Sequence, residues 1–126
     1  MKIKLSRAGG FTLVEIMIVV AIIGLLATIA IPNFVRARLK AQSAACINNL
    51  RQIDGAKQEW ALENKANATV TPQSTDIQQY MGRGTQGSLP VCPLDTSAKF
   101  DSSYSINSLQ TAPTCVVPGQ TNHVLN

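Results

Sequence analysis

The sequence predicts an α+β protein in which a long N-terminal helix packs on a small antiparallel β-sheet head. A 21-residue segment from Phe11 to Ile31 contains 17 apolar residues, and an amphipathic pattern with helical spacing follows it. The rest of the chain is rich in Gly, Pro, Ser, Thr, Asn and Gln. A chain of 126 residues has room for one modest domain. Its low apolar content after Pro32 argues against a soluble enzyme with a deep active site.

Residues 1–10 form a short basic leader that ends in Gly9-Gly10. A secretory signal is cleaved after its apolar part, but no Ala-x-Ala site follows Ile31, so we expect the apolar segment to remain in the mature protein. Without the leader the net charge of the chain falls from +4 to +1. The basic pI is therefore no sign of nucleic-acid binding, and we expect no specific nucleic-acid partner.

Residues 11–32 predict a transmembrane helix, because their apolar length is sufficient to cross a bilayer. Three cationic side chains precede this segment and three follow it closely (Arg36, Arg38 and Lys40), so the charge rule does not fix its orientation. Pro32 lacks a backbone N–H and is expected to kink the helix without ending it.

Residues 33–66 predict an amphipathic helix. Apolar side chains recur there at steps of three and four residues and form a stripe that is expected to face the head: Leu39, Cys46, Leu50, Ile53, Ala56 and Trp60. Polar and charged residues cover much of the remaining helix surface.

Residues 67–126 predict a small head rich in β-structure and loops. Asp76–Met81 is expected to form one helical turn, and the glycines between residues 82 and 87 mark a loop. Short strands are predicted at Leu89–Cys92, Phe100–Asn107 and Thr114–Val117.

Glu15 is the charged residue inside the apolar segment. A carboxylate costs several kcal/mol to place in hydrocarbon, so it needs a partner or access to water. It could lie at the membrane interface, or it could pair with a cation from another chain, since its own first turn carries no charged side chain. Cleavage between Gly10 and Phe11 would create such a cation, an α-amino group at the start of the helix.

Residues 7–27 read RAGGFTLVEIMIVVAIIGLLA. This segment, followed by Pro32, resembles the class III leader and N-terminal helix of type IV pilins and type II secretion pseudopilins. The resemblance implies that a prepilin peptidase cleaves after Gly10 and N-methylates Phe11. It also implies that Glu15 neutralises the N-terminus of a neighbouring subunit during assembly.

The resemblance implies a structural subunit and not an enzyme. The subunit would span the bacterial inner membrane once, with its head in the periplasm or outside, before leaving the bilayer for a periplasmic or extracellular filament. Its partners would be further copies of itself, minor pilins or pseudopilins and an inner-membrane assembly platform. We expect a role in protein secretion; an adhesion, motility or DNA-uptake pilus is the alternative. A single-span anchor with a ligand-binding head is the alternative of another class, but a plain anchor has no use for Glu15.

Cys92 and Cys115 flank the predicted strands of the head and are expected to form a disulfide. An exported domain with a thin core gains about 3 kcal/mol from such a bond. Cys46 lies on the helical stripe and is expected to be a small buried apolar side chain, although it could pair with a head cysteine or another chain.

The sequence predicts no catalytic residues and no metal site. The three cysteines and His123 contain no close-spaced pair of ligands, so zinc is not expected, and His123 is interpreted as a surface or packing residue. Calcium at Asp95 and Asp101, as in the heads of major pseudopilins, is the one candidate cofactor that remains. Two carboxylates six residues apart in a loop support it only weakly.

Overall fold

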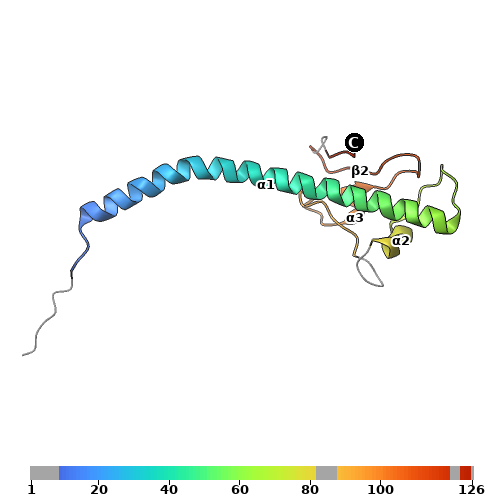
Figure 1. Ribbon diagram of the computed structural model, residues 1–126, viewed down its shortest axis with the longest axis horizontal. Helices are drawn as coiled ribbons and strands as arrows, with labels where there is room; N and C mark the ends of the chain where they lie inside the picture. The colour runs from blue at the N-terminus through green and yellow to red at the C-terminus, as the bar shows by residue number, and fades with distance from the viewer. Residues whose placement is uncertain (1–8, 82–87, 120–122, 126) are drawn as a thin grey trace, which may run out of the picture. The chain divides into compact units, whose positions relative to one another are not determined.

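The computed structural model describes residues 9–81, 88–119 and 123–125 of the chain (Figure 1). The chain divides into two compact units, Met1–Arg38 and Leu39–Asn126. Most of the predicted leader and the predicted glycine loop at residues 82–87 lie outside the described residues.

Helix α1, Leu13–Asn64, includes both predicted helical segments, and Pro32 lies inside it. The helix ends where Lys65 adopts a left-handed backbone conformation with φ of 49°. The N–H of Ala66 then donates to the carbonyl of Ala61 at 3.1 Å. This bond satisfies a carbonyl that the end of the helix would otherwise leave without a donor.

The described part of the head contains four short elements besides the single turn η1 (Gln78–Tyr80). They are α2 (Ser74–Ile77), α3 (Phe100–Ser103), β1 (Tyr104–Ser105) and β2 (Thr114–Cys115). Strands β1 and β2 pair antiparallel, with Tyr104 opposite Cys115 and Ser105 opposite Thr114. The predicted α+β class, with its long helix and small antiparallel sheet, is confirmed, and so is a helical turn near residues 76–81.

The prediction of a strand at Leu89–Cys92 is wrong, because this segment has no regular secondary structure. Pro90 has no N–H to donate to a strand ladder. Neighbouring backbone groups bond to side chains instead: Asn49 Nδ2 donates to the carbonyl of Val91 at 3.3 Å, and the N–H of Cys92 donates to Ser103 Oγ at 3.1 Å.

The predicted strand Phe100–Asn107 is also shorter in the structure, because its first four residues form helix α3. Ser102 Oγ donates to the carbonyl of Lys99 at 3.0 Å, and the N–H of Tyr104 closes the turn on the carbonyl of Phe100. Local side-chain bonding of this kind competes with strand pairing.

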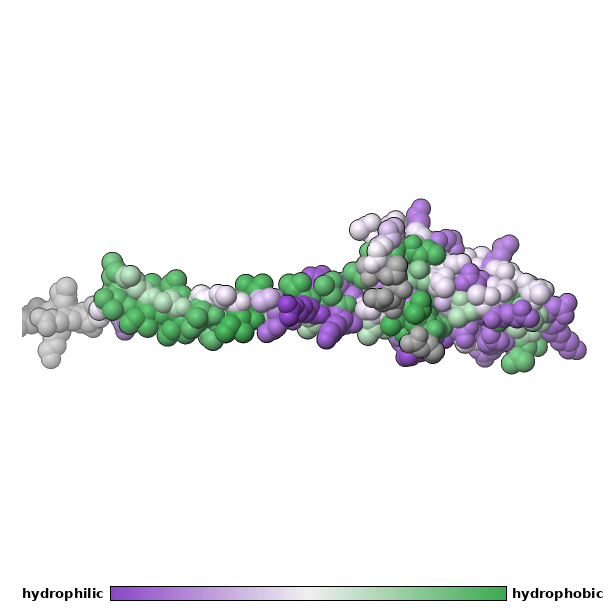
Figure 2. All heavy atoms as spheres, turned by 90° about the horizontal axis from the view of Figure 1, so that it is seen from above, coloured by the Kyte–Doolittle hydropathy of each residue, from purple (hydrophilic) through white to green (hydrophobic). Residues whose placement is uncertain are grey.

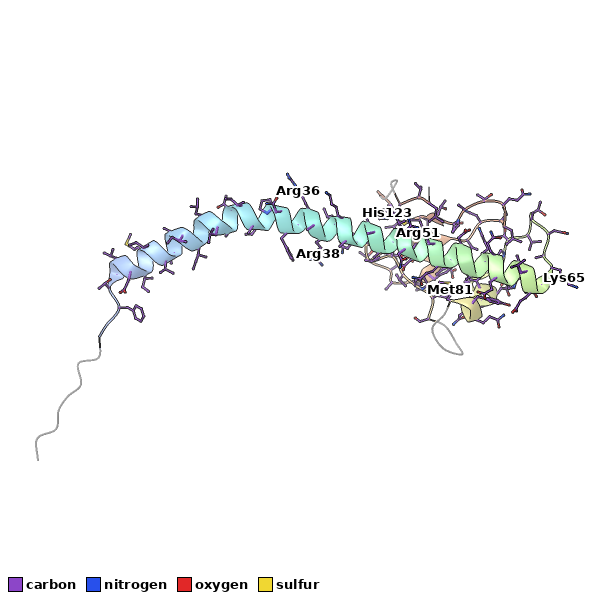
Figure 3. All side chains as sticks on the ribbon, in the orientation of Figure 1. Arg36, Arg38, Arg51, Lys65, Met81 and His123 are labelled. Carbon is purple, nitrogen blue, oxygen red and sulfur yellow. The ribbon has the colours of Figure 1, made fainter. Side chains whose placement is uncertain are left out.

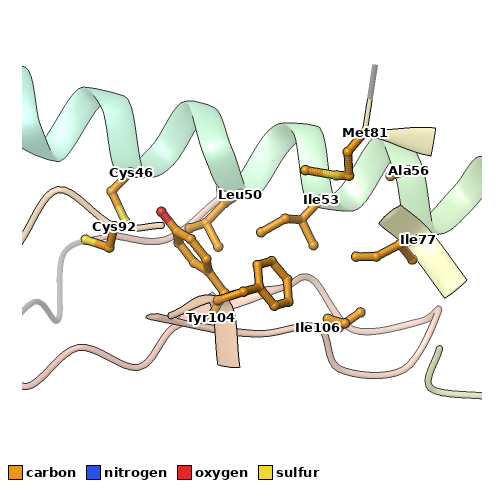
Figure 4. Close-up of a cluster of buried hydrophobic side chains, with 10 residues drawn as sticks. Cys46, Leu50, Ile53, Ala56, Ile77, Met81, Cys92, Tyr104 and Ile106 are labelled. Atoms are coloured by element: carbon orange, nitrogen blue, oxygen red, sulfur yellow. The ribbon is translucent and has the colours of Figure 1, made fainter. Parts of the chain in front are cut away.

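The core of the second unit lies between α1 and the elements of the head (Figure 4). Helix α1 contributes Cys46, Leu50, Ile53 and Ala56, as the stripe predicted, and Trp60 packs partly against them. The head contributes Ile77, Met81, Cys92, Phe100, Tyr104 and Ile106. Leu39 was predicted on the same stripe, but it is 52% exposed because it lies at the start of this unit, before the core begins.

Lys57 is a fully buried cation on the core side of α1. Its Nζ donates to the carbonyls of Ile106, Ser108 and Thr111 at 3.4, 3.1 and 2.6 Å and lies 3.4 Å from Asp54 Oδ1. These bonds compensate for the burial of its charge. They also fix residues 106–111 against the helix.

Candidate functional site

The first unit presents an apolar helix with no protein around it. Every large apolar side chain from Phe11 to Ile31 is at least half exposed, and hydrophobic atoms dominate the face of this segment seen in Figure 2. Helix α1 is the one helix among the described residues that is long and apolar enough to cross a membrane. A surface of this kind is stable in a bilayer or against other apolar helices.

Glu15 has partners within its own chain. Its Oε2 accepts hydrogen bonds from the backbone N–H and the hydroxyl of Thr12, both at 3.2 Å. In return, Thr12 Oγ1 accepts the N–H of Glu15 at 3.2 Å. This reciprocal arrangement is a capping box, which satisfies backbone donors at the start of α1. The first turn contains no charged partner for Glu15, as its sequence predicts, but the neutral donors of Thr12 hydrogen-bond the carboxylate.

The predicted cleavage junction precedes this cap. Gly10 and Phe11 have no regular secondary structure, and the Phe11 side chain is 83% exposed. A Cβ placed on Gly10 would meet no atom within 4 Å. Within the single chain, the backbone at this junction is open to an enzyme.

Further along the first unit, small or charged residues interrupt the apolar surface. A Cβ on Gly24 would also meet no atom within 4 Å, so another helix could approach closely there. Pro32 leaves the carbonyl of Thr28 without its usual helical donor. Arg36 and Arg38 extend away from α1, where membrane headgroups could contact them (Figure 3).

Asp95 is bound by serines, not by a second carboxylate. Its Oδ2 accepts hydrogen bonds from Ser102 Oγ at 2.6 Å and Ser103 Oγ at 2.7 Å, and its Oδ1 accepts the N–H of Ser97 at 2.8 Å. Bonds from Ser102 and Ser103, with that N–H, lower the pKa of Asp95 to about 2. Asp101, the other predicted calcium ligand, is exposed on α3.

The head brings together residues that the sequence keeps far apart. Atoms of Cys46, Cys92, Cys115 and His123 that can bind a metal all lie within 4.8 Å of one another. All three cysteines are free thiols in this structure. Burial raises the pKa of the Cys46 thiol to about 12 and also raises that of Cys115. Cys46 is buried as predicted, and His123 is buried as well, at 3% exposure.

Comparison with known proteins adds an independent observation. Residues 5–31 match the family model described as the prokaryotic N-terminal methylation motif. The chain is 46% identical over 57 residues to the type IV major pilin protein PilA of Myxococcus xanthus, covering 45% of this chain and 26% of that protein. It is 35% identical over 66 residues to the type II secretion system core protein G of Klebsiella pneumoniae, covering 52% and 47%.

A fimbrial protein of Pseudomonas aeruginosa is 40% identical over 67 residues, covering 52% of this chain and 44% of that protein. The chain therefore spans less than half the length of these curated relatives. No solved structure matches it.

The methylation motif lies at the start of an exposed apolar helix that is long enough to cross a membrane. In this N-terminal segment the chain is similar to a type IV major pilin and to type II secretion system core protein G.

Sequence reasoning missed the roles of three residues. The role of Thr12 was detectable, because Thr-x-x-Glu is a capping-box pattern. The roles of Lys57 and His123 were not detectable, since the surroundings of each side chain form only when segments distant in sequence meet.

Proposed function

We propose that this chain is the structural subunit of a pilus-like or pseudopilus filament, produced by prepilin peptidase cleavage after Gly10 and N-methylation of Phe11. The methylation motif at residues 5–31 and the open Gly10–Phe11 junction support this processing. Before assembly, residues 11–32 would be embedded in the inner membrane.

The observation that carries the proposal is Glu15, the single charged residue between Phe11 and Ile31 on an otherwise apolar exposed helix. In a filament core this carboxylate would pair with the new α-amino group of Phe11 on an adjacent subunit. In the single subunit, the Thr12 donors keep the carboxylate hydrogen-bonded until that cation becomes available. A buried pair of this kind sets the register between neighbouring helices.

We assign the filament to protein secretion, with minor pseudopilins and an inner-membrane assembly platform as partners. The similarity to type II secretion core protein G and the short head support this assignment. The similarity to PilA and to the fimbrial protein favours the second candidate, a pilus for adhesion, motility or DNA uptake. Deleting the gene should abolish secretion of exported enzymes; loss of motility or DNA uptake with normal secretion would favour the second candidate.

Glu15→Gln tests the assembly step more sharply than Glu15→Ala. Glutamine keeps the acceptor that completes the capping box but removes the charge. Both variants, each expressed as the sole subunit, should be inserted and cleaved normally but fail to assemble. An unpaired buried α-amino group costs about 3–5 kcal/mol per contact. Sheared surface material should contain at least a hundredfold less protein than the wild type.

Thr12→Ala is the matched control, because it removes the two hydrogen bonds of the Thr12 hydroxyl from the cap and keeps the charge of Glu15. It should still polymerise. Filaments of normal length and number from Glu15→Gln would show that Glu15 acts only as a helix cap.

Intact-mass measurement checks the processing: we expect a chain that begins at methylated Phe11. A mature chain that begins at Met1 or after Ile31 would contradict the processing proposal. A correctly processed protein that never forms filaments would favour a membrane-anchored binding module.

A further inference from the structure

The thiol–imidazole cluster of Cys46, Cys92, Cys115 and His123 serves no step of filament assembly. Its four members come from α1, from the segment before α3, from β2 and from the C-terminal segment. Cys46, Cys92 and His123 are at most 3% exposed, and Cys115 is half-buried. Figure 4 shows Cys46 and Cys92 at one end of the core cluster, next to the Tyr104 hydroxyl.

His123 provides a second and independent observation. Its Nδ1 is buried and has no hydrogen-bond partner among the described residues. Leaving such an atom without a partner costs about 1–3 kcal/mol. One ring nitrogen of His123 lies within 4.8 Å of all three sulfurs, so the imidazole is placed where it could bind a cation together with the three cysteines.

We propose that these four side chains bind one zinc ion as a structural Cys₃His site. Three thiolates and one imidazole are a common structural ligand set for zinc, and four protein ligands leave no open position for catalysis. With Zn–S near 2.3 Å and Zn–N near 2.0 Å, tetrahedral ligands lie about 3.5–3.8 Å apart. The cluster, whose ligand atoms lie within 4.8 Å of one another, needs only a small contraction to reach that geometry.

The ion would stabilise the head by joining segments that share few backbone hydrogen bonds. Among the described residues, the head has two strands of two residues each and two α-helices of four residues each. A zinc ion would join four of these segments at one point, and its binding free energy would add to folding. Zinc binding and the predicted Cys92–Cys115 disulfide exclude each other, because a bonded sulfur is not a thiolate ligand.

The test uses the full chain in detergent, purified without reductant or chelator, and analysed for metal content and free thiols. We expect one zinc per chain and three thiols that resist alkylation until a chelator removes the metal. Replacing zinc with Co²⁺ should give the intense visible bands of tetrahedral cobalt and a sulfur-to-cobalt charge-transfer band.

His123→Ala should lower zinc affinity by more than about 100-fold, since loss of a supporting residue alone costs 10–100-fold. Val124→Ala, an exposed neighbour in the same segment, should leave the affinity unchanged. His123→Cys keeps four ligands, so it should retain one zinc and strengthen the charge-transfer band of the cobalt form.

Three results would overturn the proposal. They are a Cys92–Cys115 disulfide in the protein as purified, no binding when the reduced chain is titrated with zinc, and equal binding by the wild type and His123→Ala. None of these results depends on whether the chain forms filaments.

Discussion

At the residue scale, Glu15 has one partner in its own chain, Thr12, and we propose a second partner in the filament. The Thr12-x-x-Glu15 spacing is sufficient to predict the cap, because the capping box is a local pattern. No local sequence pattern predicts the proposed partner on a neighbouring subunit. That partner is inferred only because an unpaired carboxylate is costly in an apolar environment.

A second residue pair, Tyr80 and Glu63, makes the head sensitive to alkaline pH. The Tyr80 hydroxyl donates to Glu63 Oε2 and joins η1 to the last turn of α1. This bond to Glu63 raises the pKa of Tyr80 above its ordinary value. Because the folded-state pKa is raised, the stabilisation is complete below pH 10 and is lost as the pH rises through that pKa.

We predict that Glu63→Gln moves the pKa of Tyr80 back toward 10, as followed by phenolate absorbance. The chain has two tyrosines, so Tyr80→Phe supplies the baseline of Tyr104 alone. The interaction would be refuted if the wild type and Glu63→Gln titrated identically after subtraction of that baseline.

At the element scale, α1 is one helix with two environments. Its N-terminal part exposes apolar side chains on all sides, whereas its C-terminal part buries a single stripe against the head. Continuous apolar length predicted the first part and apolar periodicity predicted the second, since both are local properties of the sequence. It failed at Leu39, because periodicity identifies a face of a helix but not where the covering elements begin.

Leu50 and Leu39 are a matched pair on this helix. Leu50 is fully buried and Leu39 is 52% exposed. We predict that Leu50→Ala destabilises the head by about 2–5 kcal/mol through the cavity that it creates, and that Leu39→Ala changes head stability by less than about 0.5 kcal/mol. The fluorescence of Trp60, the only tryptophan, reports unfolding because Trp60 packs against the core. Equal losses in the two variants would contradict this division of α1.

At the scale of the whole molecule, features set by neighbouring residues could be predicted from the sequence. Features formed by residues far apart in the sequence could not. The long helix and the apolar segment follow from periodicity and composition. Leu89–Cys92 looked like a strand, but its backbone groups bond to Asn49 and Ser103, which no local pattern reveals. The thiol–imidazole cluster was missed for the same reason, because zinc-site patterns rely on ligands that are close in sequence.

Lys57 tests how the head is held to its helix. Lys57→Met keeps the apolar stem but leaves the carbonyls of Ile106, Ser108 and Thr111 without their donor. We predict a loss of about 3–5 kcal/mol in head stability by urea unfolding monitored at Trp60. Lys40→Met, at an exposed position of the same helix, should be neutral. Unfolding midpoints that agree between the two variants would show that the bonds of Lys57 contribute no net stability.

The burial of Lys57 also makes its amine unreactive toward reagents in solution. Among the described residues it is the one buried lysine, so reagents that acylate amines, and trypsin, reach the exposed lysines but not this one while the head is folded. Acylation of Lys57 therefore indicates that the head has unfolded. Lys57 is therefore a built-in reporter of the unfolding of the head, and it is read by finding which lysines an amine reagent has modified.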